Sequence, residues 1–261
     1  LKYLRKISSR AERNIVILID EYDHFTNELL SFNLELFKSS VASNGFVRKF
    51  FEVIKTFTGE GLVARLFATG VTPVTLDSLT SGFNIAKNLT LDEIFNETMG
   101  FEEHEVAKLL EYYEIPNSEA VLSDMRGFYN GSRFSTRAEK KLYNSNMVIY
   151  FLDELYSKQK YPQALIDVNI ASDYGKISNI FGLVPGNESE RRITEIMEEG
   201  ETGAIITEQF SFEREFTIND VVSLLFYNGL LTIKDVDFGN TIFAVPNYVI
   251  RELYWAFIAK R

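Results

Sequence analysis

The sequence predicts an α/β fold in which part of a parallel sheet is followed by a helical segment and a small helix–hairpin–helix unit. Residues 15–19 (Ile-Val-Ile-Leu-Ile) form a continuous apolar run that is mostly β-branched. Such a run is typical of a strand buried on both faces of a parallel sheet. A second apolar run covers residues 62–68. Because apolar residues at helical spacing lie between the two runs, the order strand, helix, strand predicts a right-handed βαβ unit.

The elements of this first part follow from spacing and turn residues. Helical spacing covers residues 33–57 and is broken near Asn44-Gly45, and Gly59 to Gly61 predicts a turn before the second strand. Residues 70–84 are rich in Gly, Ser, Thr and Pro and are predicted to form a loop. A short strand is predicted near residues 85–91.

The rest of the chain is predicted to be helical and then to change character. Helical stripes and amphipathic segments are predicted at 106–113, 148–155, 172–182 and 188–199. The tail predicts a helix at 216–227, strands at 230–233 and 241–245 around a turn at 237–240, and a last helix after Pro246. A helix, hairpin and helix of this size resemble a winged-helix module. The predicted domains are therefore residues 1–98, 99–203 and 204–261.

The composition limits the classes of function. The chain has 261 residues, a net charge of −10, no Cys and two well-separated histidines, so disulfides, thiolate metal sites and a local zinc motif are excluded. No apolar run approaches the roughly 20 residues that cross a bilayer, and the first residues do not form a cleavable signal. We therefore expect a cytoplasmic protein with no membrane partner. The negative charge argues against nucleic-acid binding by the whole chain.

Acidic residues directly follow the first strand. Asp20, Glu21 and Asp23 lie at its carboxyl end, where parallel sheets place their ligand crevice. Adjacent carboxylates repel each other unless a cation or ligand hydrogens offset the charge. The pattern is that of a Walker B strand, so Asp20 is predicted to bind Mg²⁺ and Glu21 to act on the water that attacks ATP. The alternative is a strand followed by an Asp that caps a helix.

Two further residues are candidates for contacts with the nucleotide. Thr69 ends the second strand beside the expected position of Asp20, so it is predicted to sense the γ-phosphate, as the sensor 1 residue of AAA-type ATPases does. A threonine that satisfies its own turn is the alternative. Arg133 lies in a polar turn between aromatic residues and is predicted either to contact a phosphate bidentately or to pair with an acid of this chain.

The phosphate-binding half of an ATP site is not found in this sequence. The pattern G-x-x-x-x-G-K-[ST] is absent from the 261 residues. Gly59-Glu60-Gly61 precedes a strand instead of following one, and Gly175-Lys176 follows no buried strand, so both are interpreted as turn glycines. Glu139-Lys140-Lys141 has no accompanying acidic strand, and so the chain shows no nuclease site.

Several separated segments together resemble one protein family. They are Leu18–Asp23, Ala68–Pro73, Ser81–Ile85, Gly100–Val106, Phe128–Phe134, Leu142–Asn144, Asn228–Ile233 and Val245–Asn247. In this order and spacing they resemble a bacterial family of AAA-ATPase-like proteins, which are P-loop ATPases related to the archaeal and STAND ATPases.

The resemblance implies a P-loop α/β core, a helical segment and a winged-helix-like unit. Members usually carry a phosphate loop upstream of the acidic strand and often a PD-(D/E)XK-type nuclease domain downstream. Since the chain starts at Leu1 close to that strand, we expect a fragment without the Walker A loop. The chain departs from the family pattern at Ser132 and at Asn144-Ser145, where a Tyr and an Asn-Pro are common.

The sequence therefore predicts a portion of an AAA-like ATPase that supplies Walker B and sensor residues for hydrolysis of Mg-ATP and that regulates a partner or a downstream domain. The fragment alone is expected to be inactive. Its winged-helix-like unit is the expected contact for a nucleic acid or a partner protein. Two alternatives stay open: a non-catalytic scaffold with a degenerate NTPase fold, and the regulatory region of a nuclease.

Overall fold

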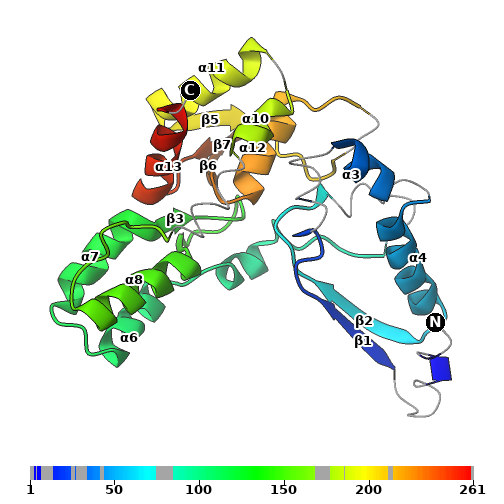
Figure 1. Cartoon of the computed structure of the whole chain (residues 1–261), viewed down its shortest axis with the longest axis horizontal. Coiled ribbons are helices and arrows are strands. Elements are labelled where there is room, and N and C mark those ends of the chain that lie inside the picture. The colour runs from blue at the N-terminus through cyan, green and yellow to red at the C-terminus, as the bar shows by residue number, and fades with distance from the viewer. Residues whose placement is uncertain are drawn as a thin grey trace. The chain divides into compact units, whose positions relative to one another are not determined.

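The chain folds into two compact units, each described by itself (Figure 1). Unit 1 comprises Leu1–Lys87 and Thr207–Glu215, and unit 2 comprises Asn88–Ile206 and Phe216–Arg261. The computed structural model describes residues 3, 5–6, 14–24, 27, 34–41, 44–74, 85–167, 177–184, 186–210 and 214–259.

Unit 1 contains a parallel pair of strands with helices between them in the sequence. Its described elements are β1 (Ile15–Ile19), α3 (Leu34–Val41), α4 (Phe46–Gly59) and β2 (Val63–Ala68). β1 pairs with β2 in parallel, with Ile19 opposite Ala68. The predicted parallel pairing and the predicted break in the helical segment are therefore confirmed.

One face of the β1–β2 pair is covered and the other is not. α4 packs against β2 through an apolar stripe whose members recur at helical spacing and are all buried: Val47, Phe51, Ile54 and Phe57. On the other face Leu18 is 74% exposed, and its register partner Phe67 is 54% exposed. The prediction that both faces of these strands are buried is therefore wrong for the described part of unit 1. An apolar run predicts a strand from the preferences of its residues. It does not predict whether another element packs on each face of that strand.

Unit 2 begins with three helices and a short antiparallel pair. Its first elements are the 3₁₀ helix η1 (Glu93–Thr98), α6 (Glu103–Tyr112), α7 (Ser118–Tyr129), β3 (Asn130–Ser132), β4 (Leu142–Tyr143) and α8 (Ser145–Lys158). They are followed by α10 (Ile177–Gly182), α11 (Asn187–Glu199), β5 (Glu201–Ala204), α12 (Ile218–Tyr227), β6 (Thr232–Asp237), β7 (Asn240–Ala244) and α13 (Tyr248–Ile258). The predicted helices at 106–113, 148–155 and 188–199 and the predicted helix, hairpin, helix order of the tail are confirmed. Of the helix predicted at 172–182, residues 177–182 form α10, and residues 172–176 lie outside the described residues.

Capping side chains explain where several of these helices begin. Asn144 caps α8 by accepting a hydrogen bond from the Met147 amide at 3.1 Å, and Asn247 caps α13 in the same way through the Ile250 amide. α12 begins with a capping box in which Thr217 and Asp220 bond each other's backbone amides. Each cap satisfies amide groups that the first helical turn leaves without partners.

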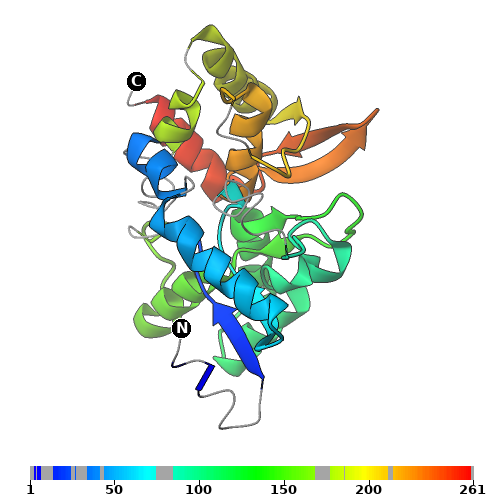
Figure 2. The ribbon, with the colours of Figure 1, turned by 90° about the vertical axis from the view of Figure 1, so that its right-hand side faces the viewer.

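The tail of unit 2 is built on a three-stranded antiparallel sheet in the order β5-β7-β6. Figure 2 shows the β6–β7 hairpin projecting beyond the helices of its unit. The sequence did not predict β5, which lies in a short polar stretch without alternation of apolar residues. The strand predicted near residues 85–91 is wrong, since residues 85–89 form no regular element and residues 90–91 form a turn before η1.

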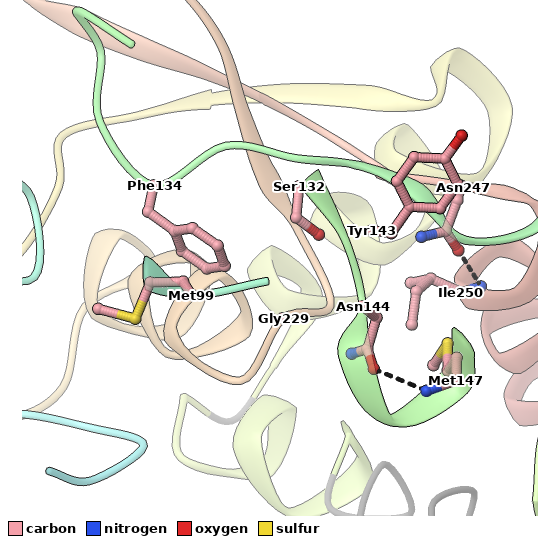
Figure 3. Close-up of a pocket in the computed structure, with 9 residues that line it drawn as sticks. All are labelled: Met99, Ser132, Phe134, Tyr143, Asn144, Met147, Gly229, Asn247 and Ile250. Carbon is pink, nitrogen blue, oxygen red and sulfur yellow. Dashed lines mark hydrogen bonds between the residues drawn. The ribbon is translucent and has the colours of Figure 1, made fainter. Parts of the chain in front are cut away.

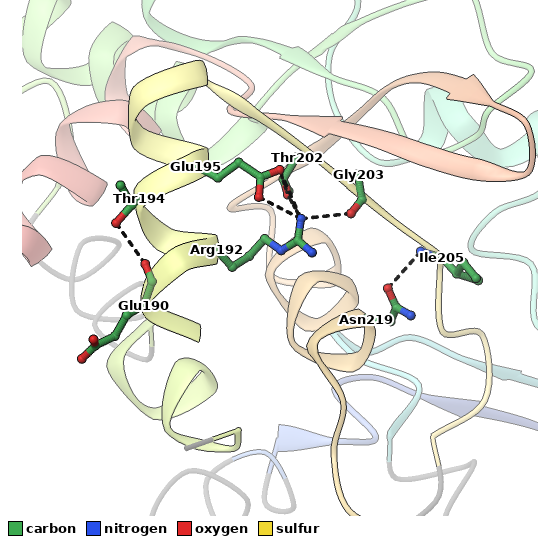
Figure 4. A network of polar contacts seen from close by, with 8 residues as sticks. All are labelled: Glu190, Arg192, Thr194, Glu195, Thr202, Gly203, Ile205 and Asn219. Carbon is green, nitrogen blue, oxygen red and sulfur yellow. Dashed lines mark hydrogen bonds and ion pairs between the residues drawn. The ribbon is translucent and has the colours of Figure 1, made fainter. Parts of the chain in front are cut away.

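A polar network joins α11 to β5 (Figure 4). The guanidinium of Arg192, which is largely buried, donates to the Glu195 carboxylate at 3.0 Å and to the Thr202 hydroxyl at 2.6 Å. It also donates to the carbonyl oxygen of Gly203 at 3.2 Å. Because a buried guanidinium is costly without partners, these bonds fix the position of β5 against the helix that precedes it.

None of the described helices is long and apolar enough to span a membrane.

Candidate functional site

The candidate site lies at the carboxyl ends of β1 and β2 in unit 1. Because the two strands run parallel and Ile19 pairs with Ala68, the residues that follow them, Asp20 and Thr69, emerge at the same edge. The backbone continues the ladder there. The Thr69 amide donates to the carbonyl oxygen of Ile19 at 2.8 Å, and the Tyr22 amide donates to the carbonyl oxygen of Thr69 at 2.9 Å.

Asp20 and Thr69 are in direct contact. The Thr69 hydroxyl donates to Oδ1 of Asp20 at 2.5 Å, and the Glu21 amide donates to the same oxygen at 3.1 Å. Both residues are exposed. Within the described part of the chain Oδ2 of Asp20 has no bonding partner, so this oxygen is available to a ligand from solvent. The structure therefore brings together two of the four predicted site residues in a hydrogen bond.

Glu21 is the third predicted residue and is presented to solvent on an unusual backbone. Its φ is +51°, which is rare for a residue other than glycine, and its side chain is 70% exposed. Nδ1 of His24 lies 3.5 Å from its carboxylate, so a protonated His24 would pair with it. Backbone strain of this kind persists only where the surroundings impose it, and it is concentrated at functional sites.

Asp23 is the buried carboxylate of this region, although the sequence suggested no more than a helix cap for it. The side chain is 1% exposed and accepts hydrogen bonds from the amides of Val71 and Thr72, the latter at 2.6 Å. The Thr72 hydroxyl and the side-chain amide of Asn27 donate to it as well, at 3.2 and 2.5 Å. The carboxylate therefore joins the loop after β1 to the loop after β2.

Tyr22 and Gly70 complete the joint between the two loops. The Tyr22 hydroxyl donates to the carbonyl oxygen of Thr72 at 2.6 Å. A Cβ atom at position 70 would lie 2.4 Å from Oδ1 of Asp23 and 2.5 Å from Cε1 of Tyr22, so this position requires glycine. The one available signal in the sequence was the pairing of two short motifs, Asp-Glu-Tyr-Asp and Thr-Gly-Val-Thr, after neighbouring strands.

The oxygen atoms at this edge suit a hard cation. Magnesium is usually held by one or two carboxylates, with water and phosphate oxygens completing its six ligands. An exposed Asp20 carboxylate with a free oxygen meets the protein's share of that requirement. The described residues contain no group of three or more His, Cys, Asp or Glu side chains that could hold a metal by themselves. A metal at this edge would therefore need ligands from a bound nucleotide and from water.

Arg133, the fourth predicted residue, lies in unit 2 and makes backbone contacts there. Its guanidinium donates to the carbonyl oxygens of Ile233 at 3.0 Å, of Ala138 at 3.3 Å and of Lys234. Its own amide donates to the Thr232 hydroxyl at 2.7 Å. These bonds clamp the base of the β6–β7 hairpin and give the arginine a structural role. A phosphate contact for Arg133 stays a prediction.

A small cavity lies in unit 2, where several segments quoted for the family resemblance meet (Figure 3). It is lined by Met99, Ser132, Phe134, Tyr143, Asn144, Met147, Gly229, Asn247 and Ile250. Its volume is about 50 Å³, whereas pockets for nucleotide-sized ligands measure roughly 300–1,000 Å³. The cavity is therefore too small for ATP.

The residues around this cavity serve packing. A Cβ atom at Gly131 would lie 1.9 Å from the carbonyl oxygen of Pro246, so only glycine allows these two segments to touch. Asn144 and Asn247, which line the cavity, are the helix caps described above. Close packing and helix capping therefore account for the residues of the segments after residue 100 that contribute to this region.

Comparison with known proteins gave one match, and it covers most of the first segment of unit 1. Searches of curated proteins and of solved structures found no match to the chain. Residues 1–80 match the sequence model of the AAA-ATPase-like family, which is described as "Predicted AAA-ATPase". This range holds β1, β2 and the contact between Asp20 and Thr69, and the segments after residue 80 lie outside it. The match thus indicates an ATPase-like family for the part of the chain that carries the candidate site.

Proposed function

We propose that the carboxyl ends of β1 and β2 form the metal-holding and water-orienting half of an ATP-hydrolysing site. The observation that carries the proposal is the hydrogen bond between Thr69 and Asp20 at the ends of two adjacent parallel strands. Ligands of open α/β sheets bind at this edge. The match of residues 1–80 to an AAA-ATPase-like family supports the same chemistry.

Each residue has a defined role in this proposal. Asp20 holds Mg²⁺, directly or through water, with the oxygen that Thr69 leaves free. Bound Mg²⁺ would neutralise charge on the phosphate oxygens. Glu21 orients the attacking water and accepts its proton on a carboxylate oxygen, for which its exposure is suited. Thr69 carries a hydroxyl that can turn from Asp20 to a γ-phosphate oxygen, and the Asp23 joint holds both loops in place.

The proposal needs a phosphate-binding segment that is not among these 261 residues, since the sequence has no G-x-x-x-x-G-K-[ST] loop. Tests therefore use the full-length protein. We further propose that hydrolysis regulates a partner or a downstream domain, which is supported by a helix–hairpin–helix unit on the same chain.

Replacement of the proposed base tests the assignment. In the full-length protein Glu21→Gln should lower kcat for ATP hydrolysis by about 10²–10⁴-fold, because the water loses its proton acceptor. Affinity for Mg-ATP should change little, because the glutamine keeps the shape of the side chain. Hydrolysis is measured as phosphate release, and affinity by equilibrium binding of a fluorescent ATP analogue.

The matched control is Glu35→Gln on α3, a highly exposed glutamate that is not among the proposed site residues. It should leave both quantities unchanged. Normal hydrolysis by Glu21→Gln would remove Glu21 from the mechanism. If the unaltered full-length protein binds no Mg-ATP, the site is degenerate and the chain acts as an interaction scaffold.

A further inference from the structure

The tip of the β6–β7 hairpin has an unusual conformation for the residue it carries. Asp237 pairs with Asn240, so a two-residue turn of Phe238 and Gly239 joins the strands. Both residues have positive φ, +45° and +88°. A turn of this kind has type I′ geometry, which favours Asn, Asp or Gly at its first position. Phenylalanine there is strained.

No contact of Phe238 within the described chain offsets this strain. Phe238 is fully exposed, so its ring gains no burial. The other described non-glycine residues with positive φ are polar: Glu21, Glu114, Asn117 and Gln159. A single exposed apolar residue is ordinary on a protein surface, but one held in a strained backbone at a projecting tip is not.

Hydrogen bonds hold the hairpin at its base, so the unusual backbone of its tip does not come from a poorly packed hairpin. Arg133 bonds the carbonyl oxygens of Ile233 and Lys234, and the Thr232 hydroxyl bonds the backbone of Arg133 in return. Ile233 of β6 and its register partner Phe243 of β7 are buried. A ring presented on a rigid support loses little freedom when it binds, which favours its use as an anchor.

The charges around the tip indicate the kind of partner. Asp235 and Asp237 are exposed and, being two residues apart on β6, project from the same face. Of the described cations beside this part of β6, Lys234 is paired with Glu201, and the Arg133 guanidinium is bonded to the carbonyl oxygens of Ile233 and Lys234. Nucleic-acid phosphates would repel the two aspartates that flank the aromatic ring. It fits an apolar pocket with lysine or arginine at its rim.

We propose that the tip of the β6–β7 hairpin is a protein-docking element. Phe238 enters an apolar pocket on a partner protein, and Asp235 and Asp237 pair with basic residues at the pocket's rim. The proposal does not depend on the ATP site, and it gives the regulatory partner a recognisable surface.

Site-specific photo-crosslinking tests the proposal in cells that express the full-length protein. Phe238 is replaced by p-benzoylphenylalanine, which keeps an aromatic ring at the tip. The matched control carries the same residue at Tyr112, which is 78% exposed on α6. We expect one dominant protein adduct from position 238 and none of that mass from position 112. The mapped crosslink should lie in an apolar pocket with Lys or Arg beside it.

Charge reversal and a stability measurement complete the test. Asp235→Lys with Asp237→Lys should lower the crosslink yield at least about fivefold, because the new lysines would face like charges at the pocket's rim. Asp153→Lys on α8 should not change it. Phe238→Asn should melt at the same or a higher temperature, because asparagine suits the turn.

Four results would overturn the proposal. They are a nucleic-acid adduct, equal adducts from positions 238 and 112, a yield insensitive to charge reversal, and a lower melting temperature for Phe238→Asn. Hydrolysis of ATP by Phe238→Asn is measured in parallel. Unchanged hydrolysis separates a failure of the docking element from a failure of the ATP site.

Discussion

Asp23 determines how the two loops of the candidate site are held. Its carboxylate accepts hydrogen bonds from two backbone amides of the facing loop and from two side chains. An ionised carboxylate is an acceptor only, so it can satisfy all of these donors at once. The exposed residues Asp20 and Glu21 are therefore positioned by a buried neighbour.

The first prediction concerns this buried carboxylate. Asp23→Asn should lower the free energy of unfolding of unit 1 by about 2–4 kcal/mol, because the charge is lost and one of the two acceptor oxygens becomes an NH₂ group that faces a buried donor, at the least the amide of Val71. Urea denaturation measures the change. The matched control Asp153→Asn, at an exposed position, should stay within about 0.5 kcal/mol of the unaltered protein. Equal effects of the two substitutions would contradict the role given to Asp23.

Residue order explains why part of the site was predictable. Asp20 and Thr69 each follow a recognisable apolar strand, and parallel pairing brings such positions together whatever the loops do. The role of Asp23 was hidden, because its main donors lie 48 and 49 residues away in the sequence. Hydrogen bonds of that separation depend on the folded chain and leave no local pattern.

Among the secondary-structure elements, α6 and α7 are joined by a bidentate ion pair. Arg126 donates to both carboxylate oxygens of Glu103, at 2.6 and 2.7 Å. Bonding by the guanidinium lowers the pKa of Glu103 below its ordinary value, against a smaller opposing effect of desolvation, and the Tyr143 hydroxyl adds to the lowering. The pair is largely exposed, so its contribution to stability is small.

The second prediction is the pH dependence of this pair. Because the pKa of Glu103 is lower in the folded state than in the unfolded state, its stabilising effect is fully present above the unfolded pKa, about 4.5, and is lost as the pH falls through the folded pKa. Glu103→Gln should therefore have a lower urea midpoint than the unaltered protein at pH 7, and the difference should shrink as the pH falls below about 4.5. Glu119→Gln on α7 provides the control. A difference independent of pH would contradict the assignment.

Helices were predictable here because their apolar spacing recurs over several turns and polar caps mark where they begin. Short strands were not. β5 has four residues of which Thr202 and Ala204 are buried, a pattern set by its pairing with β7. The reverse error at residues 85–91 has the same cause, since an apolar stretch becomes a strand when another strand bonds it.

At the scale of the whole molecule, the net charge follows directly from the sequence. The chain has 37 acidic and 27 basic residues. Its net charge of −10 opposes the counterion release on which non-specific DNA binding depends. A hairpin between two helices therefore does not by itself make unit 2 a DNA-binding module.

The third prediction tests this reasoning. Binding to a duplex of about 20 base pairs at about 150 mM salt should be weaker than about 100 μM, the weak end of the range for non-specific binders. Fluorescence anisotropy of labelled DNA measures it. Asp235→Lys with Asp237→Lys should strengthen binding, because it turns the hairpin tip from acidic to basic. Submicromolar affinity of the unaltered chain would contradict the prediction.

By itself the sequence determined the α/β class, the parallel pairing of the first two strands, most helices and the charge, because these depend on local spacing and composition. It also placed Asp20, Glu21 and Thr69 at one edge, since strand ends are local features. The tertiary structure alone decided that Asp23 joins two loops and that Arg133 clamps a hairpin, and it left one face of β1 and β2 exposed. These features depend on which residues far apart in the chain come into contact, and no local pattern encodes that.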